Sequence, residues 1–218
     1  KYGQQNFSKK RYKVLTLEHS FHGRTITTVK ATGQTSFHKE AFAPYPEGFS
    51  FHEQIRALIE AIDEETVAVM IELVQGEGGV QPLDKVAVQE LAAFLKERQL
   101  LLIIDEVQTG VFRSGEFLAS QLYDITPDII TLAKGLAGGV PIGAIMTTHK
   151  TLFEVGDHGS TFGGNFLSTR AGLEVLEILE SYKQSGMLDE AFLFFEGRLR
   201  DIVKKHPHVF EKELGLGL

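Results

Sequence analysis

Two side chains that can do acid–base chemistry follow apolar segments in the middle of this sequence. Asp105 ends the run LLIID at residues 101–105, and Lys134 comes directly after DIITLA at residues 128–133, in front of a glycine-rich stretch. Each residue taken alone is more often a solvated surface charge. An acid and an amine at the carboxyl ends of two strands of one α/β sheet can, however, converge on a single crevice. The pair therefore predicts a site in which the carboxylate and the amine face one ligand.

The acidic pair Asp105-Glu106 has two other interpretations. It could supply the magnesium-binding aspartate of a nucleotide triphosphatase, which also needs a phosphate loop of the form G-x-x-x-x-G-K-[ST]. The chain contains no Gly-Lys pair, so that loop would have to lie in sequence upstream. The pair could also be a solvated strand end without any chemistry, because acids at strand ends are common.

Short apolar segments without a polar face predict buried strands at five places along the chain. They are residues 12–17, 67–73, 100–105, 128–133 and 143–148. Amphipathic segments between them, residues 53–62 and 84–99, predict helices, and Asp84 is expected to cap the second one. Strand and helix alternate, which predicts an α/β fold with a mainly parallel sheet flanked by helices.

The last part of the chain predicts helices without further strands. Residues 165–182 and 187–206 have helical patterns. We expect a large domain over residues 1–180 and the start of a small C-terminal α/β domain over residues 181–218. The chain begins with a residue other than methionine and ends in an apolar, glycine-punctuated phrase, so we expect it to be part of a longer polypeptide.

Composition argues against several classes of partner. The chain has 22 Lys and Arg against 29 Asp and Glu, a net charge of −7, and no basic run, so no nucleic-acid partner is expected. The apolar segments are too short to span a bilayer, so no membrane partner is expected. Without cysteine there is no disulfide and no thiolate metal site, which favours a reducing compartment and predicts a cytoplasmic location. Two histidine pairs, His19 with His22 and His206 with His208, lack a suitably spaced third ligand, so no metal site is predicted.

Five ordered motifs carry a stronger signal than any single residue. They are SFHGRT (20–25), ELVQGEGGV (72–80), DEVQTG (105–110), AKG (133–135) and HGSTFGGN (158–165). In this order and spacing the sequence resembles the class III pyridoxal-phosphate-dependent aminotransferases over essentially its whole length. It is most similar to the acetylornithine and ornithine aminotransferase group. The resemblance implies the fold type I architecture and pyridoxal 5'-phosphate as the cofactor.

The resemblance assigns roles around the cofactor ring. Lys134 matches the lysine that links covalently to the cofactor and moves a proton during catalysis. Asp105 matches the acid that pairs with the pyridine nitrogen and keeps it protonated, as an electron sink requires. Phe21 is expected to stack on one face of the ring and Val107 to pack on the other, while Gln108 reaches the phenolic oxygen.

Other cofactor-binding residues follow from the same motifs. His22 lies beside Phe21 in the first motif and is expected to bind the cofactor as well. Ser160 and Thr161 stand in a glycine-flanked turn that can donate hydrogen bonds to a phosphate, although the turn could also simply precede a helix capped by Asn165. In the family Thr161 matches a threonine that reaches the phosphate in the neighbouring subunit, which implies a homodimer with shared active sites.

Substrate recognition is implied for two residues. Arg24 resembles an arginine that binds a substrate carboxylate, for which a planar two-pronged donor is suited. Glu77 resembles a glutamate that covers a second substrate-binding arginine, which we expect downstream of residue 218. The implied reaction moves the distal amino group of N-acetylornithine to 2-oxoglutarate, a step of arginine biosynthesis. Ornithine, succinylornithine, 4-aminobutyrate and lysine aminotransferases are the alternatives within the family.

Four departures from the family pattern accompany these assignments. Leu73 stands where the family usually has proline, and Leu214 stands where arginine is common. The chain is also shorter than usual around residues 49–52, and the family's main phosphate cradle precedes the point where this sequence begins. A truncated, catalytically silent association module is therefore the alternative to an enzyme.

Overall fold

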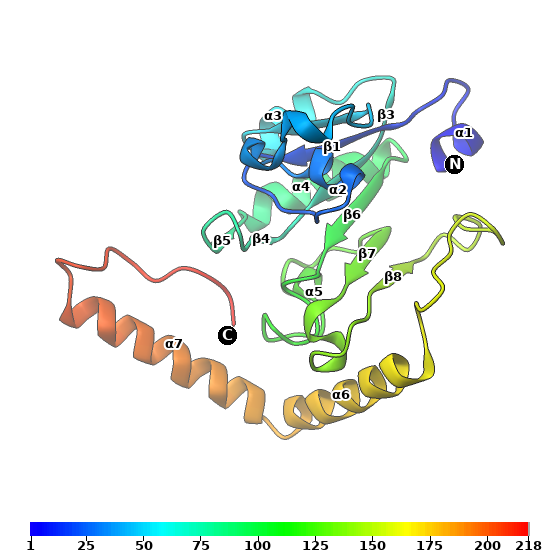
Figure 1. Cartoon of the computed structure of the whole chain (residues 1–218). Helices are drawn as coiled ribbons and strands as arrows, with labels where there is room; N and C mark the ends of the chain where they lie inside the picture. The colour runs from blue at the N-terminus through cyan, green and yellow to red at the C-terminus, as the bar shows by residue number, and fades with distance from the viewer. Residues whose placement is uncertain (218) are drawn as a thin grey trace.

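A six-stranded sheet organises the computed structural model, which describes residues 1–217 (Figure 1). The strands lie in the order β2-β1-β3-β6-β7-β8. Their bounds are β1 Lys13–Leu17, β2 Phe49–His52, β3 Thr66–Ile71, β6 Leu101–Asp105, β7 Ile129–Leu132 and β8 Ala144–Thr147. All neighbours pair in parallel except β7 and β8, which are antiparallel. The structure thus confirms the predicted mainly parallel α/β sheet.

The register of the central strands aligns their carboxyl ends. Ile71 of β3 pairs with Ile104 of β6, and Asp105 pairs with Thr131 of β7. The residues that follow these three strands therefore emerge at one edge of the sheet, which is where open α/β sheets place their ligands. Both Asp105 and Lys134 belong to this edge.

One face of the sheet carries the main core. The helices α3 (Ile55–Glu60) and α4 (Lys85–Glu97) pack there, and the apolar stripe of α4 is fully buried at Val88, Leu91 and Leu95. The carboxylate of Asp84 accepts a hydrogen bond from the backbone N–H of Ala87 at 2.8 Å, which confirms the predicted N-cap. Leu15, Val69, Ile71, Leu102 and Ile104 of the strands meet these helices in the same cluster.

The prediction of a buried strand at residues 143–148 is wrong in its burial. A strand forms there as β8, but Ile145 and Met146 are 54% and 42% exposed. The strand is the last of the sheet and pairs only with β7, so its apolar run has a neighbour on one side alone. An apolar run without a polar face does not by itself show that a strand is central.

Several short elements were not predicted from the sequence. They are α1 (Tyr2–Asn6), α2 (Ile26–Ala31), α5 (Ala119–Leu122), the 3-10 helices η1 (Thr35–Phe37), η2 (Glu40–Phe42) and η3 (Lys134–Ala137), the strand β2, and the small antiparallel ladder of β4 (Val74–Gln75) with β5 (Gln81–Pro82). All of these elements have six residues or fewer, which is too short for a hydrophobic period to develop.

Two long helices close the chain. α6 (Phe166–Gln184) begins at Asn165, whose side chain caps it by accepting the N–H of Ser168, and α7 (Met187–Lys205) follows after a short turn. α6 packs against η3, the element that carries Lys134, and Figure 1 shows α6 and α7 meeting at an angle beyond the sheet. The predicted division near residue 180 lies inside α6 and stays a prediction. Within residues 1–217 no helix is both long and apolar enough to cross a membrane.

Glu106, the second acid of the pair, belongs to the scaffold. Its side chain is fully buried and accepts hydrogen bonds from the backbone N–H groups of Ala119 and Ser120, at 2.9 and 2.8 Å, and from the hydroxyl of Thr109 at 2.6 Å. The carboxylate thereby satisfies the free N–H groups at the start of α5. The two neighbouring acids consequently have different functions.

We expect Glu106→Ala to lower the free energy of unfolding by at least about 3 kcal/mol, because two backbone N–H groups and one hydroxyl lose a buried charged partner. Urea unfolding followed by circular dichroism measures this change. The matched control is Glu90→Ala on the exposed side of α4, which should stay within about 0.5 kcal/mol. Equal stabilities for the two variants would contradict the structural role of Glu106.

Candidate active site

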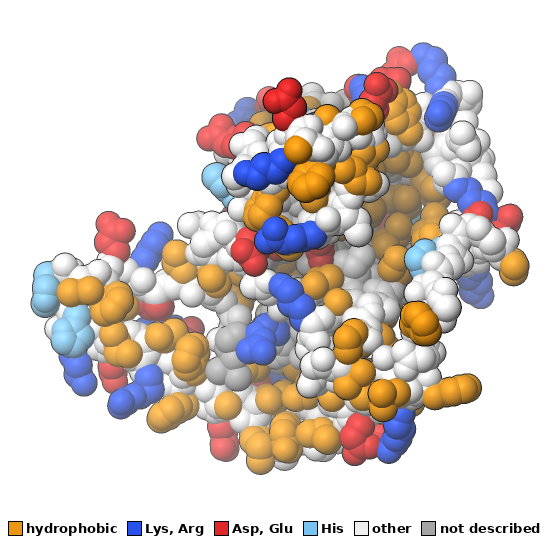
Figure 2. Space-filling model, viewed as in Figure 1, with side chains coloured by type: hydrophobic (Ala, Val, Ile, Leu, Met, Phe, Trp, Pro, Cys, Tyr) orange, Lys and Arg blue, Asp and Glu red, His pale blue; other side chains and the backbone are white. Residues whose placement is uncertain are grey.

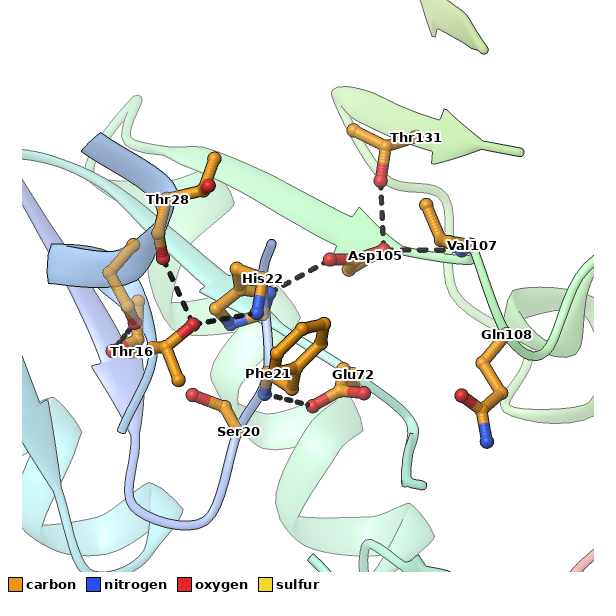
Figure 3. Close-up of polar contacts among 12 residues, drawn as sticks. Thr16, Ser20, Phe21, His22, Thr28, Glu72, Asp105, Val107, Gln108 and Thr131 are labelled. Carbon is orange, nitrogen blue, oxygen red and sulfur yellow. Dashed lines mark hydrogen bonds and ion pairs between the residues drawn. The ribbon is translucent and has the colours of Figure 1, made fainter. Parts of the chain in front are cut away.

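Asp105 stands at the carboxyl end of β6 and is held by three hydrogen bonds (Figure 3). Its Oδ1 accepts the backbone N–H of Val107 at 3.1 Å and the hydroxyl of Thr131 at 3.0 Å, and its Oδ2 lies 2.8 Å from Nδ1 of His22. The residue is 6% exposed. A carboxylate can accept about four hydrogen bonds, so Asp105 retains capacity for one more donor.

His22 is the buried partner of Asp105. Its side chain is completely buried, its backbone N–H donates to the hydroxyl of Thr32 at 2.9 Å, and its Nδ1 faces the carboxylate of Asp105. Because a carboxylate only accepts, Nδ1 carries the proton in this contact. The other ring nitrogen, Nε2, is buried and has no hydrogen-bond partner among residues 1–217. The imidazole therefore acts as a fixed donor that orients Asp105.

Glu72 adds a second buried carboxyl group next to Asp105. Glu72 follows Ile71 as Asp105 follows Ile104, so the β3–β6 register brings the two acids to adjacent strand ends. Its Oε2 accepts the backbone N–H of Phe21 at 2.8 Å. The pKa of Glu72 is raised from 4.5 to about 7. Burial is the main cause and the charge of Asp105 adds to it, whereas the Phe21 N–H, His22 and Lys134 oppose the rise. Asp105, His22 and Lys134 thus all lie close enough to Glu72 to affect its ionisation.

Lys134 comes two residues after the end of β7 and opens η3. Its backbone φ of 42° lies in the left-handed region that favours glycine, and strain of this kind is characteristic of functional sites. The side chain is exposed and its Nζ donates a hydrogen bond to Oε1 of Gln108. A cavity of about 610 Å³ opens beside it, lined by Val107, Gln108 and Lys134 and by side chains of α6 and α7.

Gln108 is confined by the turn that contains Gly76. A Cβ atom on Gly76 would lie 2.1 Å from Nε2 of Gln108, which is a severe overlap. A side chain at position 76 would force the end of the Gln108 side chain to move, so glycine here preserves the present position of the amide. The motifs ELVQGEGGV (72–80) and DEVQTG (105–110) therefore meet at this point, although they are far apart in the sequence.

Phe21 and Arg24 form a small aromatic–cationic group. The ring of Phe21 lies edge-on to Phe37 with centroids 5.5 Å apart. The guanidinium of Arg24 lies 5.5 Å from the centre of the Phe21 ring and 4.7 Å from that of Phe37. Arg24 is exposed and has no ion-pair partner within the described chain, so its charge is free to bind an anionic group.

The structure does not bring all predicted residues together. Ser160 and Thr161 are exposed and make no contact with Lys134 or Asp105 in residues 1–217; the hydroxyl of Ser160 only accepts the N–H of Gly163. The loop that carries them turns toward the other end of the sheet, where Asp157 pairs with Lys1. Glu77 is exposed at the tip of the turn between β4 and β5, and its side chain makes no contact with the cluster. The roles of these three residues stay predictions.

Four residues of the site were not singled out from the sequence. Thr131 and Thr32 hold Asp105 and His22, Phe37 lies against Phe21, and Glu72 anchors the backbone of Phe21. Only Glu72 had a usable signal, because it is an acid at a strand end like Asp105. Among residues 1–217 no group of three or more possible metal ligands occurs.

Comparisons with known proteins agree with the motifs. The model of the family described as aminotransferase class III matches residues 1–218. The acetylornithine aminotransferase of Wolinella succinogenes is 58% identical over the whole chain and 56% of its own length, and that of Caldanaerobacter subterraneus subsp. tengcongensis is 44% identical over 97% of the chain and 54% of its own. The crystal structure of the ornithine aminotransferase from Toxoplasma gondii superposes with a TM-score of 0.90 at 31% identity, covering the whole chain and 53% of that protein. The chain therefore spans about half the length of the relatives it matches.

The raised pKa of Glu72 gives a pH-dependent stability with a definite sign. Between pH 4.5 and about 7 the folded protein keeps a proton that the unfolded chain releases, so stability falls as pH rises through this window. We expect Glu72→Gln to remove this decline, which is on the order of 2–3 kcal/mol. Urea unfolding at pH 5 and pH 8 measures it, and an equal decline in both proteins would show that other groups cause it.

Proposed function

The chain belongs to the class III aminotransferase family, and from this premise we propose that it carries the catalytic centre of a pyridoxal-phosphate-dependent aminotransferase. One observation supports the proposal most directly. Asp105 ends β6 and Lys134 follows the neighbouring β7, and Lys134 lines one cavity together with Val107 and Gln108, which come directly after Asp105. Sequence motifs alone do not require that convergence.

The residues of the site fit the cofactor. Asp105 has room for one more donor and is fixed by His22 and Thr131, as a partner for a protonated ring nitrogen must be. Phe21 and Val107 supply an aromatic and an aliphatic surface for the two ring faces. When bound, pyridoxal phosphate supplies an electron sink for the charge that develops on the substrate carbon bearing the amino group. The carboxylate of Asp105 stabilises the positive charge that this sink requires.

Lys134 supplies the amine and moves the proton. Its side chain is exposed at the mouth of the cavity, so the Nζ atom is accessible to a carbonyl group. The hydrogen bond to Gln108 holds the amine on the side of Val107. A lysine fixed at its backbone by η3 and at its amine by Gln108 is positioned to take a proton from one carbon and return it to another.

Arg24 and Glu77 are the proposed substrate residues. The guanidinium of Arg24 is held by two aromatic rings and can pair with a substrate carboxylate. We propose N-acetylornithine as the amino donor and 2-oxoglutarate as the acceptor, as in arginine biosynthesis, because the relatives named above include acetylornithine aminotransferases. Ornithine, succinylornithine, 4-aminobutyrate and lysine are the alternative donors. A coupled assay that compares them against 2-oxoglutarate decides the substrate.

A homodimer is proposed from the motif HGSTFGGN (158–165), which carries Ser160 and Thr161. Thr161 and Ser160 do not reach the site of their own chain, which is what a contribution to a partner's phosphate site requires. The adjoining Phe162, Phe166 and Leu167 are 82%, 94% and 73% exposed, an unusual exposure for large apolar side chains. Figure 2 shows apolar side chains gathered along the lower edge of the molecule, where α6 lies in Figure 1. A second subunit would cover them. A cytoplasmic location stays a prediction that rests on the absence of cysteine.

Binding of the cofactor provides the first test. We expect added pyridoxal phosphate to give a visible absorption band, and borohydride reduction followed by peptide mapping to place the label on Lys134. The Lys134→Ala variant is the control and should give neither band nor label. A missing band in the unchanged protein would favour the silent association module.

Asp105→Asn tests the role of the carboxylate. Removing an attraction of about 4 kcal/mol on the ring nitrogen corresponds to a loss of turnover of about a thousandfold. The amide oxygen of asparagine still accepts from Val107 and Thr131, and its NH2 can donate to Nδ1 of His22 in the other neutral tautomer, so the fold and the labelling of Lys134 should remain. Steady-state turnover and the borohydride label are measured together, and undiminished turnover would refute the assignment of Asp105.

A further inference from the structure

The Phe21-His22 dipeptide is tied to three different parts of the fold. The backbone N–H of Phe21 donates to Glu72 after β3, the backbone N–H of His22 donates to Thr32 after α2, and the ring of His22 contacts Asp105 of β6. The two ties of His22 lie within the buried interior. The tie to Glu72 fixes the backbone of Phe21, and its half-buried ring is held otherwise only by contacts with Phe37 and the exposed Arg24 within the described residues.

Charged and titratable groups surround Glu72 on the elements packed against it. Asp105 ends the neighbouring strand β6, and the charges of His22 in the segment after β1 and of Lys134 in η3 also act on the pKa of Glu72. Asp105 accepts three hydrogen bonds and is the better stabilised anion, whereas Glu72 accepts only the N–H of Phe21 within the described chain. When two adjacent carboxyl groups share one site, the less stabilised group binds the proton.

We propose that Glu72 is a positioning residue whose ionised carboxylate fixes Phe21, and whose protonation loosens the aromatic ring from its place beside Asp105. The inference rests on the proposed function, in which this ring faces the cofactor. It adds that the protonation state of Glu72, which is not among the proposed cofactor-binding residues, controls where the Phe21 ring lies.

The chemistry of the hydrogen bond supports this control. A backbone N–H bound to an ionised carboxylate makes a charge-assisted bond that is roughly twice as strong as a neutral one. Protonation of Glu72 converts the first kind into the second without removing any atom. The raised pKa of about 7, caused mainly by burial, places this change within the working range of pH.

A single tryptophan reports ring placement without any cofactor. The chain contains no tryptophan, so Phe21→Trp introduces the sole indole fluorophore at the ring position. We expect its emission maximum to shift between pH 5.5 and 8.5 with a midpoint near 7. Adding Glu72→Gln keeps the shape and an acceptor oxygen but removes the titration, so the shift should disappear.

Two further variants separate Glu72 from its neighbours. Glu72→Asp keeps an acid but withdraws it from the N–H of Phe21, so the titration should remain with its amplitude reduced at least about twofold. Glu18→Gln, which removes an acid three residues before Phe21 in the sequence, should leave the midpoint unchanged. A midpoint that persists in Glu72→Gln would assign the titration to His22 and overturn the proposal. Should Glu72→Gln fail to fold, an undiminished amplitude in Glu72→Asp would overturn it equally.

The affinity for pyridoxal phosphate provides a second readout in the protein with native Phe21. We expect the dissociation constant to rise about fivefold more between pH 8 and pH 6 in the unchanged protein than in Glu72→Gln, in line with the difference between a charged and a neutral hydrogen bond. Equal pH dependence in both proteins would contradict the inference. If the protein does not bind the cofactor at all, the proposed function fails, while the tryptophan titration still decides the role of Glu72.

Discussion

The parallel, in-register pairing of β3 with β6 is the constraint from which the site follows. Once Ile71 lies beside Ile104, the next residues, Glu72 and Asp105, must emerge as adjacent acids at one edge of the sheet. Two buried carboxylates repel each other, so the fold stabilises them unequally. Asp105 receives three donors, whereas Glu72 receives one and has a pKa that is raised mainly by its burial.

The surrounding residues can be understood as supports for this asymmetry. Thr131 comes from the strand on the other side of β6, and His22 comes from the segment after β1, so the anion is held from both directions in the sheet. Lys134 follows the same strand as Thr131, so its backbone emerges at the sheet edge next to Asp105. Two neighbouring acids thus have separate roles: Asp105 is the proposed partner of the protonated ring nitrogen, and Glu106 stabilises the start of α5.

The sequence predicted the sheet, its main helices and the position of Asp105 and Lys134 at the ends of neighbouring strands, because strand ends in a parallel sheet share one edge. The strand pattern alone did not distinguish Asp105 from Glu106, since adjacent residues at a strand end point to opposite sides, and only the motif resemblance selected Asp105. It also overestimated the burial of β8, because an edge strand and a central strand can have the same apolar composition. Thr32 and Phe37 could not be found, since their contacts arise only when α2 and η1 fold over the segment after β1.

The close passage of Gly76 by the amide of Gln108 has a consequence for the lysine. With 2.1 Å available to a Cβ atom, alanine at position 76 is incompatible with the present rotamer of the glutamine. A larger residue at position 76 would therefore push the amide of Gln108 aside, and the amine of Lys134 would lose its hydrogen-bond acceptor. Substitution of this glycine thus acts on the lysine indirectly, through the rotamer of the glutamine, and not through a contact of its own.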